Sequence, residues 1–124
     1  MARILVAEDD LALRLLYRLW LEHAGHAVVE AADGRQAIEL VELGPPPEAA
    51  VLDVDMPYVD GLSVCRYLRL RDPGLPIVVA TGIEDIQPAA LAAGATTVLA
   101  KPCDRDELLA ALNTAHFAHR LRSA

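Results

Sequence analysis

The sequence AAVLD, at residues 49–53, is a short apolar run that ends in a carboxylate, Asp53. Three further runs share this form, an apolar stretch followed at once by a polar side chain: residues 4–7 before Glu8, residues 76–80 before Thr81, and residues 97–100 before Lys101. Short runs of this kind, bounded by turn residues and rich in β-branched residues, are typical of strands buried on both faces of a sheet. The sequence therefore predicts four buried strands with polar groups at the same end.

Helical segments separate these strands. A fifth strand is expected over residues 27–31, and helices are expected over the remaining segments: residues 11–24, 35–43, 61–71, 85–93 and 104–120. Gly25 ends the first helix, and Gly44 with three prolines after it ends the second. Alternating strands and helices form a parallel sheet with right-handed crossovers. We therefore expect a single α/β domain over residues 1–124, a flavodoxin-like (βα)5 fold with sheet order 2-1-3-4-5 and helices on both faces.

The composition limits the classes of function. A chain of 124 residues is long enough for one domain with a core and too short for two. The net charge of −7 argues against nucleic-acid binding, because phosphate contacts need clustered lysine and arginine. No stretch approaches the roughly 20 apolar residues of a membrane span, and no signal peptide is visible. The two cysteines, Cys65 and Cys103, fit a reducing compartment, so we expect a cytoplasmic protein without a disulfide.

The polar groups at the strand ends are expected to meet at one site. In an open parallel sheet, the carboxyl ends of the strands form the crevice where ligands bind. The groups expected to converge there are three carboxylates, a hydroxyl and an ammonium: Glu8, Asp9, Asp53, Thr81 and Lys101. Clustered carboxylates repel one another unless a cation lies among them, and Mg²⁺ takes oxygen ligands and bridges to phosphate. The sequence thus predicts a site for a divalent cation and a phosphoryl group.

Four fragments in this order resemble the receiver domain of bacterial two-component response regulators, the CheY-like family: ILVAEDD, VLDVDMPYVDG, VVATG and GATTVLAKP. The resemblance runs from about Arg3 to the last helix. It implies a signalling domain that is not an enzyme in the ordinary sense. Asp53 would accept a phosphoryl group from a phosphohistidine on a sensor histidine kinase or a histidine phosphotransfer protein, and signalling would follow by conformational change. The aspartyl phosphate would then decay by attack of water.

The resemblance also assigns roles to individual residues. Asp9 and Asp53 would bind Mg²⁺ directly, Glu8 would act through water, and the backbone carbonyl of Asp55 would supply a third protein oxygen; Mn²⁺ would substitute for Mg²⁺. Thr81 would hydrogen-bond a phosphoryl oxygen. Lys101 would pair with Asp53 before phosphorylation and with a phosphoryl oxygen afterwards, and its peptide bond to Pro102 would be cis.

Asp10 has two interpretations of about equal weight. It follows the acidic pair of the family, so its carboxylate could join the metal site. It also precedes the first helix, where an aspartate commonly caps the free N–H groups.

Two alternative functions remain open. The family usually has an aromatic residue three positions before the lysine, and here that place is Val98. A degenerate receiver that serves only as a binding module is therefore a candidate. A phosphatase of the haloacid-dehalogenase type is the other, because Asp53 and Asp55 form a DxD motif. Met56-Pro57 fits that motif poorly, and the order of the acidic groups along the chain is reversed.

The first helix carries leucines on two sides. At 100° per residue, Leu13, Tyr17, Trp20 and Ala24 share the face expected to contact the core. A second set falls away from that face: Leu11, Leu15 and Leu19. We expect this leucine stripe to be exposed and to contact either a histidine-bearing helix of a partner or a second copy of the chain in a homodimer.

Overall fold

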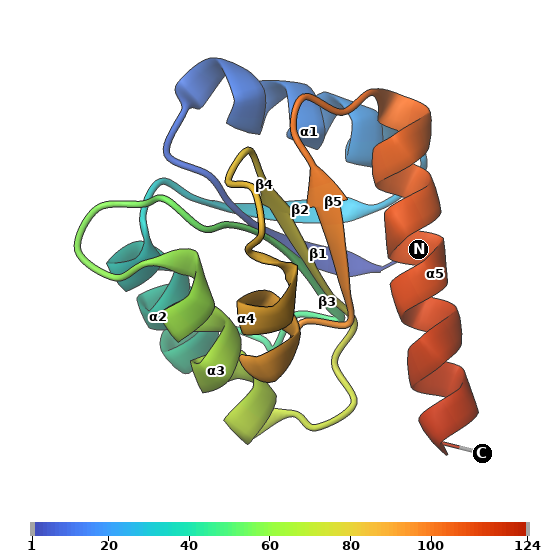
Figure 1. Ribbon diagram of the computed structural model, residues 1–124. Coiled ribbons are helices and arrows are strands. Elements are labelled where there is room, and N and C mark those ends of the chain that lie inside the picture. Colours follow the sequence, from blue (N-terminus) through green and yellow to red (C-terminus); the bar gives the residue numbers. More distant parts are fainter. Residues whose placement is uncertain (1, 124) are drawn as a thin grey trace.

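The computed structural model describes the backbone of residues 2–123 and the side chains of residues 2–116. Five parallel strands form one sheet in the order β2-β1-β3-β4-β5 (Figure 1). The strands are β1 (Arg3–Ala7), β2 (Ala27–Ala31), β3 (Ala49–Asp53), β4 (Ile77–Thr81) and β5 (Thr97–Ala100). The predicted fold class and strand order are confirmed.

Helices cover both faces of the sheet. They are α1 (Leu11–His23), α2 (Gly34–Leu43), α3 (Gly61–Arg71), α4 (Gln87–Ala92) and α5 (Arg105–Ser123). Buried residues of α1 and α5 form one core with the sheet, and buried residues of α2, α3 and α4 form the other (Figure 1). None of the helices in the described part of the chain is long and apolar enough to cross a membrane.

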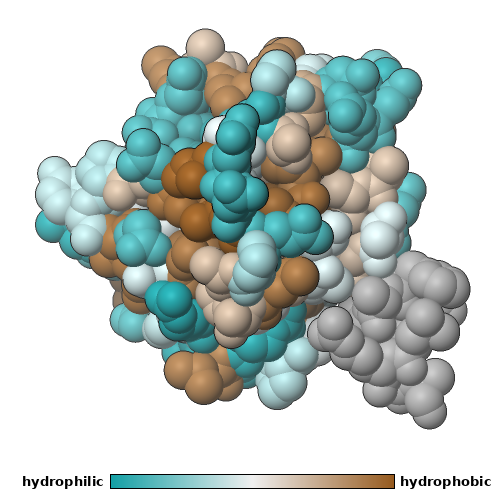
Figure 2. Space-filling view, in the orientation of Figure 1, coloured by the Kyte–Doolittle hydropathy of each residue, from teal (hydrophilic) through white to brown (hydrophobic). Residues whose placement is uncertain are grey.

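The central strands are fully enclosed by these two layers. Every residue of β3 and β4 is buried, whereas the edge strand β5 is only partly covered. Alternate residues of β3 face opposite cores, with Leu52 in the layer of α2 to α4 and Val51 in the layer of α1 and α5. Figure 2 shows the molecule from the same side as Figure 1. Hydrophobic side chains gather near the middle of this face, with hydrophilic ones between and around them.

Aspartates fix where the helices begin. Asp10, Asp33 and Asp60 each accept a hydrogen bond from the backbone N–H three residues later. At α5, Asp104 accepts from the N–H of Glu107, whose carboxylate accepts from the N–H of Asp104. The second arrangement is the capping box predicted from the sequence.

Two details of the sequence prediction are wrong. The helix predicted from Asp85 begins at Gln87, because Asp85 has a left-handed backbone conformation with φ of 59°. Ala24 does not belong to the core face of α1: it is the exposed C-cap, and Leu21 is fully buried instead. Ala24 lies past the last helical residue, so the 100° spacing no longer applies to it.

Gly61 lets α3 begin directly against the end of β3. Its N–H donates to the carbonyl of Val54 at 2.8 Å. A Cβ atom at this position would lie 1.8 Å from the backbone oxygen of Asp53. The absence of a side chain at Gly61 therefore allows α3 to lie this close to the backbone of Asp53.

We predict that Gly61→Ala lowers the free energy of unfolding by about 3 kcal/mol or more, because backbone atoms of Asp53 and Val54 must move. Gly25→Ala is the control. Gly25 has φ of 95° with no atom within 4 Å of an added Cβ, so only backbone strain of about 1–2 kcal/mol is expected. Urea unfolding measures both variants, and equal costs would contradict the close approach.

Candidate functional site

The carboxyl ends of β1, β3, β4 and β5 meet around an open cleft of about 510 Å³. The cleft contains every residue that the sequence assigned to the site: Glu8, Asp9, Asp10, Asp53, Asp55, Thr81 and Lys101. Leu13, Gly82 and Ile83 complete its lining. The sheet therefore brings together groups that lie up to 93 residues apart in the chain.

Lys101 lies between two buried carboxyl groups. Its ammonium donates to Oδ1 of Asp53 at 3.0 Å and to Oε1 of Glu8 at 2.5 Å. Asp53 is 7% exposed and Glu8 is 2% exposed. The pairing of Lys101 with Asp53 was predicted from the resemblance, but its second bond, to Glu8, was not. The peptide bond between Lys101 and Pro102 is cis, as the resemblance implied.

Three carboxylates are close enough to share one metal ion. One oxygen each from Glu8, Asp9 and Asp53 lies within 4.8 Å of the other two. All the donors are oxygens, and Asp9 is exposed to solvent while the other two are buried. An all-oxygen set with one open side fits Mg²⁺, which keeps several of its own waters.

The pKa values of the site residues reflect how deeply these charged groups are buried. Burial raises the pKa of Glu8 to about 7, against the hydrogen bonds from Lys101 and Asp10. Burial likewise raises the pKa of Asp53, with Lys101 opposing the rise. Burial would lower the pKa of Lys101, but its bonds to Glu8 and Asp53 outweigh that effect and raise it, so the ammonium stays charged. A divalent cation would offset the negative charge that one ammonium leaves uncompensated.

Thr81 is oriented for hydrogen bonding at the rim of the cleft. Its hydroxyl oxygen accepts from the N–H of Ile83 at 3.0 Å, which leaves the hydroxyl proton able to donate. Its backbone oxygen accepts from the N–H of Lys101 at 2.9 Å. Thr81 and Lys101 are therefore held beside each other at the ends of β4 and β5.

The structure favours one of the two interpretations of Asp10. Its Oδ1 accepts from the N–H of Leu13 at 3.1 Å, which is the contact of a helix cap. Asp10 is exposed and lies outside the carboxylate set that could share a metal ion. Asp55 is also exposed and lines the cleft, just beyond the end of β3.

Comparison with known proteins assigns the family. Residues 4–113 match the response regulator receiver domain. The chain belongs to this family. Over 110 residues it is 46% identical to the response regulator MprA of Mycolicibacterium vanbaalenii, a match that covers 87% of the chain and 47% of MprA. The receiver chain thus spans about half the length of the curated relatives it matches.

Solved receiver structures have the same fold. The receiver domain of the Francisella response regulator 1452 superposes with a TM-score of 0.85 at 27% identity, covering 95% of this chain and 98% of that one. A CheY-like receiver domain from Methanospirillum hungatei gives a TM-score of 0.89 and covers 98% of both chains. Its identity of 23% supports the fold alone. These comparisons give no support to the haloacid-dehalogenase interpretation of Asp53 and Asp55.

Val98 lines a second hollow of this receiver, next to the first. The hollow is about 500 Å³ in volume and lies between β5 and the segment that joins β4 to α4. Thr81, Lys101 and Val98 all border it. Val98 is partly buried and packs against the core formed with α2, α3 and α4. Val98 therefore lines a hollow that reaches from Thr81 to the start of α4.

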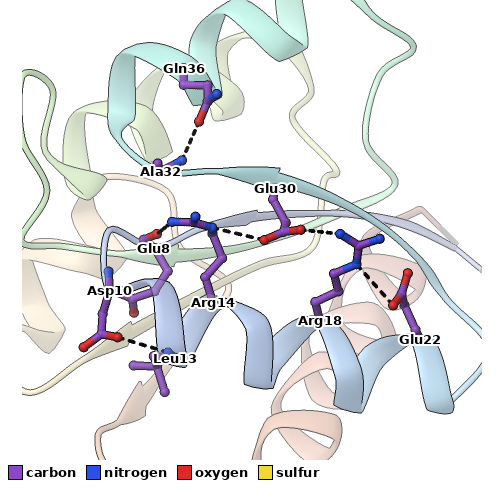
Figure 3. A network of polar contacts seen from close by, with 9 residues as sticks. All are labelled: Glu8, Asp10, Leu13, Arg14, Arg18, Glu22, Glu30, Ala32 and Gln36. Atoms are coloured by element: carbon purple, nitrogen blue, oxygen red, sulfur yellow. Dashed lines mark hydrogen bonds and ion pairs between the residues drawn. The ribbon is translucent and has the colours of Figure 1, made fainter.

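Several contacts of the site are not evident from the sequence. A fully buried tyrosine on α1, Tyr17, places its hydroxyl 3.7 Å from Sγ of Cys103, two residues after Lys101. Arg14, also on α1, reaches both the backbone of Glu8 and the side chain of Glu30 on β2 (Figure 3). The sequence alone does not reveal these contacts, because they depend on how α1 packs against the sheet.

We predict that Lys101→Met retains Mg²⁺ binding, with affinity equal to or higher than that of the wild type. The ammonium bonds two carboxyls of the candidate metal site and so competes with a cation for them. Isothermal titration calorimetry with Mg²⁺ measures the affinity. Complete loss of binding would contradict the role assigned to Lys101.

Proposed function

We propose that this receiver accepts a phosphoryl group on Asp53 from a phosphohistidine of a sensor histidine kinase or histidine phosphotransfer protein, with Mg²⁺ bound by Asp9 and Asp53. The observation that carries the proposal is the position of Asp53. It ends a central strand, contacts Lys101 at 3.0 Å, and shares one cleft with Thr81 and with the two carboxylates that could bind a metal ion together with it, Glu8 and Asp9.

The residues divide the chemistry of transfer among them. A carboxylate oxygen of Asp53 attacks phosphorus, the bond between phosphorus and the imidazole nitrogen breaks, and the nitrogen leaves with the electron pair. Asp9 and Asp53 would hold Mg²⁺, whose positive charge would offset the negative charge of the phosphoryl group. Lys101 moves from the carboxylate of Asp53 to a phosphoryl oxygen, and the hydroxyl of Thr81 donates to another. Water later attacks phosphorus, the bond between phosphorus and the Asp53 oxygen breaks, and inorganic phosphate leaves while the carboxylate is restored.

A silent receiver, acting only as a binding module, is the second candidate. Val98 favours it, because a valine cannot reproduce the inward movement of an aromatic side chain. The complete set formed by Asp53, Thr81 and Lys101 favours phosphorylation instead.

Because both Cys65 and Cys103 carry free thiols, we propose that phosphoryl transfer to this receiver takes place in the reducing cytoplasm.

Partner recognition is proposed for the leucine stripe of α1. Leu11 is 58% exposed, Leu15 45% and Leu19 63%, and α1 begins three residues after Glu8. An apolar surface beside the cleft suits a helix that carries the phosphohistidine. The exposure of all three leucines was predicted from the sequence and is confirmed.

We predict that wild-type protein incubated with acetyl phosphate gains the mass of one phosphoryl group only when Mg²⁺ or Mn²⁺ is present. Asp53→Asn should gain none, because an amide is not the nucleophile that a carboxylate is. Intact-mass spectrometry makes the comparison. Equal labelling of the two proteins would show that Asp53 is not the acceptor, and an unlabelled wild type would favour the silent module.

We predict that Leu15→Glu slows phosphoryl transfer from the partner kinase about tenfold or more, because burying a leucine is worth about 1.5–3 kcal/mol. Its labelling by acetyl phosphate should be unchanged. The control is Leu70→Glu, which adds the same charge at an 87% exposed leucine on α3. Sedimentation of both variants tests the alternative of a homodimer. A sharp fall in the melting temperature of Leu15→Glu would instead place the stripe in the core.

A further inference from the structure

Arg14 links the acidic end of β1 to β2. Its Nη1 donates to the backbone carbonyl of Glu8 at 2.9 Å, and its Nε donates to Oε1 of Glu30 at 3.1 Å (Figure 3). The side chain of Arg14 is only 14% exposed, so water shields these contacts little. A planar guanidinium that serves two acceptors in fixed directions has few other positions available.

Glu30 holds the guanidinium of Arg14 in that orientation. Its second oxygen, Oε2, accepts from Arg18 at 2.5 Å, and Arg18 also pairs with Glu22 at 3.2 Å (Figure 3). Burial would raise the pKa of Glu30, but the hydrogen bonds from Arg18 and Arg14 outweigh that effect and lower it. Glu30 therefore remains a carboxylate, able to bind both arginines at neutral pH.

The contact with Glu8 acts on the peptide group that carries Asp9. The carbonyl of Glu8 and the N–H of Asp9 belong to one rigid peptide plane. The N–H of Glu8 donates to Ala31 at 3.0 Å, and its Oε2 accepts from the N–H of Asp10 at 3.2 Å. Arg14 also donates to the backbone carbonyl of Glu8, and so restrains the orientation of the peptide group that leads from the end of β1 to Asp9.

We propose that Arg14 is a positioning residue for the carboxylates of Glu8 and Asp9, and that it strengthens Mg²⁺ binding without touching the ion. The inference rests on the proposed function, in which these carboxylates form a metal site. Residues outside the set of direct ligands that hold those ligands in position commonly contribute 10–100-fold to metal affinity.

Charge and position predict opposite effects when Arg14 is removed. Loss of a positive charge near a cation site favours the cation, so charge alone would raise the affinity for Mg²⁺. Loss of the hold on the Glu8 carbonyl would lower it. Arg18 is the matched control because it lies one turn further along α1 and also bonds Glu30, while Arg14 makes the bond to the Glu8 carbonyl.

The experiment measures Mg²⁺ affinity by isothermal titration calorimetry for the wild type, Arg14→Met, Arg14→Lys and Arg18→Met. We expect a fall of about tenfold for Arg14→Met and a smaller fall for Arg14→Lys, whose single ammonium lacks the guanidinium fork. Affinity should be unchanged or slightly raised for Arg18→Met. In metal-free protein, the amide ¹⁵N resonance of Asp9 should move in Arg14→Met and remain in place in Arg18→Met.

Equal Mg²⁺ affinities for Arg14→Met and Arg18→Met would overturn the inference while leaving the proposed function intact. If Arg14→Met does not fold, Arg14→Lys decides: wild-type affinity together with an unmoved Asp9 resonance would overturn the inference. Absence of Mg²⁺ binding in the wild type would overturn the proposed function and this inference with it. Phosphorylation by acetyl phosphate, measured separately, distinguishes these cases.

Discussion

The ammonium of Lys101 between Glu8 and Asp53 is the interaction on which the rest of the site depends. Carboxylates this deeply buried require a partner, because an uncompensated charge in the interior is costly. Lys101 meets that requirement only if the ends of β1, β3 and β5 are level with one another. The strand order places β4 between β3 and β5, so the lysine must reach past the end of β4 to contact Asp53. The two hydrogen bonds of Lys101 therefore depend on the relative positions of the strands in the sheet.

The helices serve the site through where they begin. Asp10 caps α1 directly after the acidic pair, and Gly61 brings α3 against the last residue of β3. Arg14 then bonds the backbone of Glu8 from within α1. Each contact restrains the backbone rather than the tip of a side chain, and each lies close to the segments that carry Asp9 and Asp53. Groups arranged in advance lose little freedom on binding, which is the advantage of a preorganised site.

Much of the fold could be predicted because buried strands need apolar side chains, and their short runs stand out in the sequence. Asp53, Thr81 and Lys101 could be placed at strand ends for the same reason. The bond from Lys101 to Glu8 and the bonds of Arg14 could not be predicted, since they depend on packing between elements. The start of α4 was missed because nothing in the sequence marks the left-handed conformation of Asp85. Local pattern thus specified the elements, and tertiary packing specified their polar contacts.

Lys101 directly follows β5, which pairs with β4 alone and is only partly covered. A strand at the edge of a sheet opens to solvent at a lower free-energy cost than one enclosed on both sides. Asp53 therefore ends a central strand that is buried along its whole length, whereas its counter-charge follows an edge strand. The segment that carries Lys101 is therefore expected to move more easily than the segment that carries Asp53. A change in charge on Asp53 would be absorbed mainly by movement at the edge of the sheet, while the centre remained still.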